Sequence, residues 1–132
     1  MAAADSSQSP LSVTAEQHAD CCLVSVSGRV DHTNSDNFLQ SLSGHADTVK
    51  QGGGMVIDLE RLDFITSAGL RALLLSQRTV TGANGKLIIS GIGGVVKEVF
   101  RISKFDALLS VSDNVEEAMS QISAAAAEAY SG

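Results

Sequence analysis

The sequence predicts a single α/β domain built on a small mixed β-sheet of four to five strands with about four helices. Short apolar runs rich in β-branched residues alternate along the chain with segments whose apolar residues recur every three or four positions. Such alternation of strands with helices is typical of parallel strand pairs joined by right-handed crossovers. The first two runs are separated by only a short polar turn, which favours a hairpin at the start. A length of 132 residues leaves room for one hydrophobic core.

The first part of the chain is predicted to form the hairpin and one helix. Residues 1–10 are small and polar and are expected to be a disordered tail. Residues 11–15 and 21–27 alternate apolar and polar, as half-buried strands do. A helix is expected next, with its cap at Thr33, Asn34 or Ser35. Its apolar stripe consists of Leu39, Leu42, Ala46 and Val49.

The second part repeats the strand and helix pattern. Residues 55–59 and 86–90 are apolar runs of the kind that strands buried on both faces show. A helix with Leu70, Leu73 and Leu74 on one stripe separates them. A further helix, an edge strand at 107–111 and a last helix capped by Ser112 or Asp113 follow. The alanine-rich residues 123–132 are expected to fray.

Composition and charge exclude several classes of partner. A net charge of −6 with four Phe, one Tyr and no Trp is unlike a nucleic-acid-binding surface, which needs basic and stacking groups. No run of apolar residues is long enough for a membrane span, and the first residues lack the pattern of a secretory signal. Neighbours on a strand point to opposite faces, so Cys21 and Cys22 are expected to be unpaired thiols. These features together predict a cytoplasmic protein.

The sequence contains no convincing catalytic, metal or cofactor site. The three histidines stand in three different predicted elements, and adjacent cysteines are poor zinc ligands. Ser67 follows a strand as a hydrolase nucleophile would, but Ile65 occupies the position of the required glycine and no histidine follows His45. Asp58 and Asp63 are assigned a capping or surface role. We therefore expect no enzyme activity, no metal and no cofactor.

The most informative stretch is the corner between residues 55–59 and the helix that contains Leu70. Thr66 and Ser67 stand just before the helical pattern, and either one suits the N-cap, where its oxygen accepts an unpaired backbone N–H. The other hydroxyl would lie at the positive end of the helix dipole, where an anion is stabilised. An ordinary capped corner with no further role is the alternative.

Three segments in order resemble the STAS domains, which include the anti-sigma factor antagonists and the cytoplasmic tails of sulphate transporters. The first is GRVDHT at residues 28–33, similar to the loop after the second strand of bacterial antagonists. The second is VIDL at 56–59 with FITSAGL at 64–70, and the third is VVK with VF at 95–100. The resemblance covers about residues 11–122, with a tail on either side.

The resemblance implies a regulatory binding protein. In the antagonists, the serine at the position of Ser67 is phosphorylated by a partner that is both anti-sigma factor and serine kinase, and a phosphatase reverses the modification. Partner binding is then implied at Asp31, His32, Thr66, Ser67, Ala68, Gly69, Leu70 and Arg71. The two segments that hold these residues follow strands, so we expect them at the same end of the sheet. The chain is expected to be a monomer or a weak dimer.

One residue departs from the family pattern. The antagonists usually carry Asp immediately before the phosphorylated serine, whereas this chain has Thr66. Thr66 retains a capping oxygen and is a possible second phosphoacceptor, but it lacks the carboxylate. The departure keeps open an alternative, in which the chain is a constitutive STAS docking subunit, for example of a lipid-transport ATPase complex, without a phosphoswitch.

Overall fold

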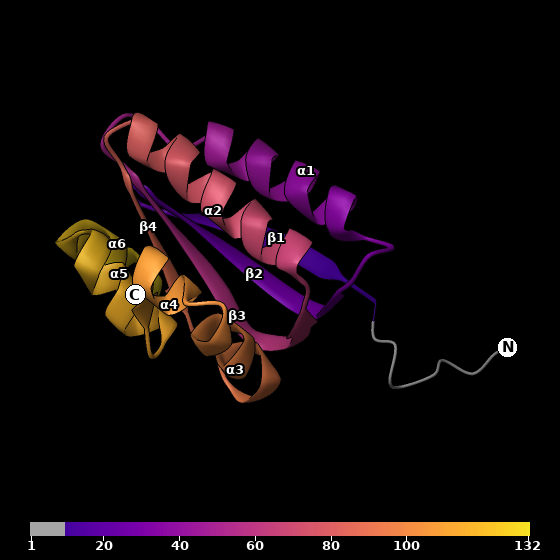
Figure 1. Cartoon of the computed structure of the whole chain (residues 1–132). Helices are drawn as coiled ribbons and strands as arrows, with labels where there is room; N and C mark the ends of the chain where they lie inside the picture. The colour runs from indigo at the N-terminus through magenta and orange to yellow at the C-terminus, as the bar shows by residue number, and fades with distance from the viewer. Residues whose placement is uncertain (1–9) are drawn as a thin grey trace, which may run out of the picture.

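The domain is built on one five-stranded sheet, seen from the side of two of its helices in Figure 1. The computed structural model describes residues 10–132, and residues 1–9 of the predicted disordered tail at 1–10 lie outside them. The strands are β1 (Ser12–His18), β2 (Cys21–Val30), β3 (Gly54–Ile65), β4 (Lys86–Ser90) and β5 (Ser110–Ser112). They lie side by side in chain order, with β1 antiparallel to β2 and every other pair parallel. The predicted mixed sheet with a hairpin start is confirmed.

The helices lie on both faces of this sheet. They are α1 (Ser35–Asp47), α2 (Ser67–Gly82), α3 (Gly94–Ile102), α4 (Phe105–Leu108), α5 (Val115–Ile122) and α6 (Ala124–Ser131). The long helices α1 and α2 pack side by side on one face, and α5 and α6 lie on the other (Figure 1). The six helices within residues 10–132 exceed the predicted four because the single-turn α4 and the helix α6 at the alanine-rich end were not predicted.

Alternation along the inner strands divides the core between the two faces. Val24, Ile57 and Ile89 belong to the cluster under α1 and α2. Their neighbours Val56 and Ile88 belong to the cluster under α5 and α6. The central strands are buried on both faces, as predicted from their continuous apolar runs.

Strand β3 is longer than the apolar run at 55–59 indicates. Its pairing with β2 continues through residues 60–63, three of which are charged, to Ile65, with two register shifts on the way. Leu59, Leu62 and Ile65 are buried at intervals of three residues. Each shift adds one residue to β3, so the inward positions lose the spacing of two by which a strand is recognised in sequence. The strand therefore does not end with the apolar run, and residues 60–65 form its second half.

The end of the chain differs from the prediction in three places. The edge strand is β5 at 110–112, because the residues before it form α4. The cap of α5 is Asn114, whose side-chain oxygen accepts the N–H of Glu117 at 2.8 Å. The end predicted to fray forms α6, where Ser123 accepts the N–H of Ala126 at 3.0 Å and the Ala126 side chain is buried.

Both cysteines are buried and free, in agreement with the prediction of unpaired thiols. Burial, with smaller contributions from Cys22 and Asp20, raises the pKa of Cys21 to about 12. Burial also raises the pKa of Cys22. Both thiols are consequently protonated at neutral pH, and the protonated form is a poor nucleophile.

Candidate functional site

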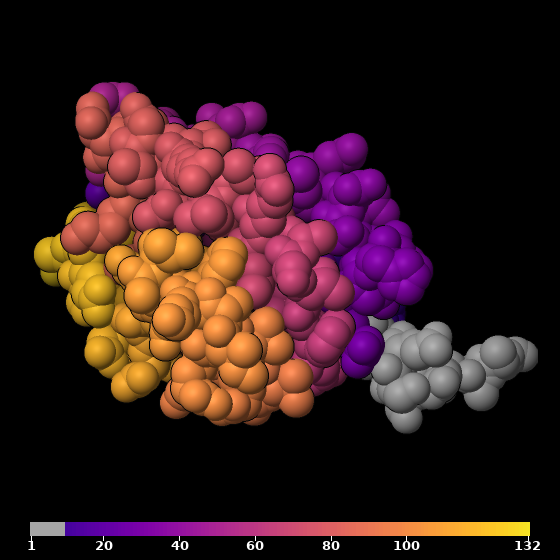
Figure 2. Space-filling view, viewed as in Figure 1, coloured from indigo at the N-terminus to yellow at the C-terminus, as the bar shows by residue number. Residues whose placement is uncertain are grey.

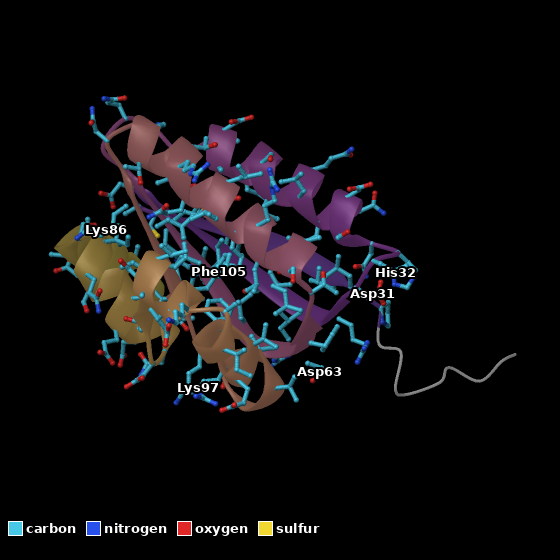
Figure 3. The ribbon with its side chains drawn as sticks, in the orientation of Figure 1. Asp31, His32, Asp63, Lys86, Lys97 and Phe105 are labelled. Atoms are coloured by element: carbon cyan, nitrogen blue, oxygen red, sulfur yellow. The ribbon has the colours of Figure 1, made fainter. Side chains whose placement is uncertain are left out.

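The candidate site lies where β2 and β3 end together. Val30 and Ile65, the last residues of the two parallel strands, are partners in the ladder, and the N–H of Thr66 donates to the carbonyl of Val30 at 3.1 Å. The chain leaves β2 through Asp31 and leaves β3 through Thr66. The predicted placement of these two segments at the same end of the sheet is therefore what the structure has, with Asp31 and His32 at that end in Figure 3.

The structure decides between the two hydroxyls of the corner. Thr66 has extended backbone angles, and its Oγ1 accepts the N–H of Gly69 at 3.3 Å, while its carbonyl accepts the N–H of Leu70 at 3.0 Å. Thr66 is thus the N-cap of α2 and Ser67 is its first residue. Ser67 is exposed, and its hydroxyl hydrogen-bonds to no other group within residues 10–132.

Removing the Thr66 oxygen should weaken the start of α2. We expect Thr66→Val, which keeps the shape of the side chain, to lower the free energy of unfolding by about 1 kcal/mol, the usual value of a hydroxyl cap. Thr66→Ser keeps the oxygen and serves as the matched control. Urea unfolding followed by circular dichroism measures both variants. Equal stability of the Val and Ser variants would contradict a capping role.

Gly69 allows the first turn of α2 to rest directly on the two strand ends. A Cβ atom at this position would lie 2.6 Å from Cγ1 of Ile65 and 2.8 Å from Cγ1 of Val30. Real Cβ contacts are longer than this, so a larger residue must push the helix away from the sheet. The glycine therefore sets the height of Ser67 above the end of β3.

This close approach predicts opposite effects of alanine at two helical glycines. Gly69→Ala should destabilise the domain by about 1–3 kcal/mol, since it forces an overpacked contact. Gly44→Ala in α1 is the control, because nothing lies within 4 Å of its added Cβ. That change should stabilise by about 0.4–1 kcal/mol through the unfolded chain. Thermal melts of both variants would test this pair of predictions. An unchanged melting temperature of Gly69→Ala would show that the corner can rearrange to accommodate a methyl group.

The loop after β2 is held by hydrogen bonds among its own residues. The carboxylate of Asp31 accepts the N–H and the hydroxyl of Thr33, and these bonds hold its pKa below the ordinary value. Asn34 accepts the N–H of Asp31 with Oδ1 and donates from Nδ2 to the carbonyl of Arg29, both at 2.9 Å. Asn34, one of the three predicted caps, is the N-cap residue of α1, and its carbonyl accepts the N–H of Phe38 at 2.9 Å. Its side chain makes no cap hydrogen bond and fastens the loop to β2 instead. Asp31 is thus held in its ionised form at the end of the sheet where the corner lies.

The eight residues implied by the family resemblance divide by exposure. Ser67, Ala68, Arg71 and His32 are exposed, and Asp31 and Thr66 are half-buried. Gly69 and Leu70 are buried, with Leu70 only 2% exposed in the core. The surface available to a partner therefore comes from the first six, and Leu70 supports the helix from below.

Other polar groups considered from sequence do not form a second site. No cluster of three or more potential metal ligands occurs within residues 10–132. Asp58 and Asp63 both lie on β3, where Asp58 accepts the N–H of Glu60 at 3.0 Å and Asp63 is exposed. Burial raises the pKa of Asp58. One contact that no sequence signal indicated is Arg29, whose guanidinium lies 4.7 Å from the ring centre of Phe64 on the neighbouring strand.

Comparisons with known proteins agree with this geometry. The family model of the STAS domain matches residues 12–118. A protein of Bordetella bronchiseptica named "Putative anti-sigma factor antagonist BtrV" is 35% identical over 91 residues, which cover 69% of this chain and 77% of that protein.

No helix in residues 10–132 is both long and apolar enough to cross a membrane.

Two solved structures have a similar fold. An anti-sigma factor antagonist from Mycobacterium paratuberculosis superposes with a TM-score of 0.75 at 19% identity, covering 86% of this chain and 94% of that one. The Bacillus cell fate determinant SpoIIAA in its phosphorylated form gives a TM-score of 0.62 at 18% identity, with 84% and 99% covered. The family model matches most of the chain, and the fold and the corner described above agree with that match. The chain therefore belongs to the STAS domain family.

Proposed function

We propose that this protein is a regulator of the anti-sigma factor antagonist type, and that phosphorylation of Ser67 switches its binding to an anti-sigma factor that is also a serine kinase. The observation that supports the proposal is that the two hydroxyl groups of the corner, those of Thr66 and Ser67, have different roles. Thr66 caps α2, so the exposed hydroxyl of Ser67 has no structural task. The relative from Bordetella bronchiseptica supports the antagonist class.

The start of α2 can accept a phosphoryl group without a change of fold. The N–H groups of Ser67 and Ala68 belong to the first turn, whose donors have no acceptor within the helix. The positive end of the helix dipole also stabilises the nearly two negative charges of a phosphate. The phosphorylated SpoIIAA structure, which has a similar fold, is consistent with a modification that leaves the scaffold intact.

The same charge would weaken a partner interface. Asp31, whose ionised carboxylate accepts the N–H and the hydroxyl of Thr33, follows the strand that ends beside the one leading to Ser67. A partner that fits the surface around Ser67 when this residue is unmodified must, after phosphorylation, either desolvate the phosphate or place its own carboxylates near it. Both are unfavourable, so the partner dissociates.

Ser67 is favoured over Thr66 as the phosphoacceptor. The hydroxyl oxygen of Thr66 is half-buried and already accepts the N–H of Gly69. Transfer of a phosphoryl group to that oxygen would remove the cap as well as the partner surface. Ser67 can be modified with the cap in place.

Incubation with a candidate kinase partner and Mg-ATP, followed by mass spectrometry, tests the assignment. We expect one phosphate on the wild type and on Thr66→Val, none on Ser67→Ala, and its removal by a serine phosphatase. Phosphate on Ser67→Ala but not on Thr66→Val would assign the switch to Thr66 instead.

The alternative is a docking subunit of the same fold with no phosphoswitch. It is favoured by one observation, which is that Thr66 stands where the antagonists usually carry Asp. Thr66→Asp separates the two functions, because it supplies the missing carboxylate and keeps a capping oxygen. Faster phosphorylation of this variant would support the switch, whereas stable partner binding with no phosphate on either protein would support the docking subunit.

A further inference from the structure

Arg71 is an exposed cation that lies one helical turn after Ser67. It is the only one of the eight residues implied by the family resemblance that carries a permanent positive charge. It takes part in no ion pair within residues 10–132, and α2 contains no acidic residue that could pair with it along the helix. Figure 2 shows the outer side of α2, in pink, uncovered between α1 and the orange segment that contains α3. The guanidinium of Arg71 can therefore bind an anion at the start of the helix.

The spacing of four residues sets Arg71 beside Ser67. Residues four apart in a helix are neighbours on its surface, with about 5–6 Å between their Cβ atoms. Both residues are exposed, whereas Leu70 and Leu73 of the same turns are buried, so the two lie on the outer face of α2. Helical side chains also lean toward the N-terminus of the helix. The long side chain of Arg71 consequently covers the turn that begins at Ser67.

A pair of this kind exists elsewhere in the chain. On α3, Nη2 of Arg101 donates to Oε1 of Glu98, three residues earlier, at 2.6 Å, and both side chains are exposed. Nε of the same arginine donates to the other carboxylate oxygen at 3.3 Å. A phosphate has three acceptor oxygens and nearly two negative charges, more than a carboxylate has. A phosphate on Ser67 is therefore a stronger acceptor for Arg71 than a carboxylate would be.

We propose that Arg71 binds the phosphate of phosphorylated Ser67 within the same molecule. The ion pair requires phosphorylation of Ser67, so it rests on the proposed function. Two phosphate oxygens accept parallel N–H groups of the guanidinium, which is the arrangement in which arginine binds phosphate most strongly. The unpaired N–H groups of the first turn of α2 are the donors for the remaining oxygen.

This pair changes the charge that the corner presents. Before modification, Arg71 is an exposed cation, and a partner can set a carboxylate against it. Phosphorylation adds nearly two negative charges and also engages the guanidinium, so a positive position becomes a negative one. Thr66 favours the pair, because an Asp at its position would add a second anion beside the phosphate. Capture of Arg71 thus removes an attraction from the partner surface at the place where the phosphate adds a repulsion.

Protein with phosphoserine incorporated genetically at position 67 tests the pair without a kinase. Phosphorus NMR over a range of pH measures the second pKa of the phosphate, which is about 6 for phosphoserine. A nearby cation lowers this pKa, so Arg71→Gln should raise it by about 0.3 pH unit or more. Arg71→Lys keeps the charge and should stay closer to the wild type. Arg78→Gln is the matched control, because Arg78 is an exposed arginine of the same helix about 16 Å from Ser67 along its axis, and it should leave the pKa unchanged.

A second measurement identifies the ion pair directly. In proton–nitrogen NMR, the Nε–H signal of Arg71 should shift between the unmodified and the phosphorylated protein, whereas that of Arg78 should not. Either an unchanged phosphate pKa in Arg71→Gln or an unmoved Arg71 signal would overturn the proposal. Because the phosphoserine is incorporated genetically, neither result depends on a kinase. Failure of a kinase to modify Ser67 rejects the proposed switch, whereas failure of these two measurements rejects the role of Arg71.

Discussion

Protein phosphorylated at Ser67 is expected to bind its kinase partner at least tenfold more weakly than unmodified protein, whereas Ser67→Ala is expected to bind permanently. Tenfold corresponds to about 1.4 kcal/mol, which one misplaced charge in an interface can cost. The alanine variant should remain folded, because Thr66 rather than Ser67 caps the helix. Isothermal titration of the partner with both forms of the protein measures the difference.

An acidic mimic at Ser67 needs a control for the mere addition of charge at a helix start. Ala124 provides it, because it is the exposed first residue of α6 and follows a hydroxyl cap, Ser123, as Ser67 follows Thr66. Ser67→Asp should weaken partner binding, and Ala124→Asp should not, although both add a carboxylate that a helix dipole tolerates. A carboxylate has less charge than a phosphate, so the phosphorylated protein is the decisive sample. Equal affinities of the phosphorylated and unmodified forms would leave only the docking subunit.

The second large effect is expected at the centre of the sheet, where Ile57→Asp should unfold the domain. Ile57 is fully buried and is the register partner of Val24 on one side and Ile89 on the other. An unpaired carboxylate at this point costs several kcal/mol, comparable with the whole stability of a small domain. Arg61→Asp puts the same residue at an exposed position of the same strand and should remain folded. Native-like urea unfolding of the Ile57 variant would show that β3 is not central.

Much of the fold could be predicted because buried side chains recur at regular intervals along the sequence. The inner strands appear as apolar runs, and the helices appear as stripes at spacings of three and four. The second half of β3 could not be found in this way, because its two register shifts space Leu59, Leu62 and Ile65 by three. Helix α6 was missed for a different reason. Alanine is compatible with a frayed end, and only the packing of Ala126 against the sheet decides that the end is a helix.

For the candidate site, the sequence by itself determined that two adjacent hydroxyls stand at a strand-to-helix corner and that a second loop follows a neighbouring strand. It also determined which family the corner resembles. Only the tertiary structure decided that Thr66 caps α2 and leaves Ser67 free. A cap is defined by backbone angles and by the direction of one N–H group. Two neighbouring hydroxyl residues therefore cannot be distinguished as caps until the backbone conformation at the start of the helix is known. Likewise, parallel pairing of Val30 with Ile65 was needed to bring Asp31 to the corner, since residues so far apart in sequence meet only through the sheet.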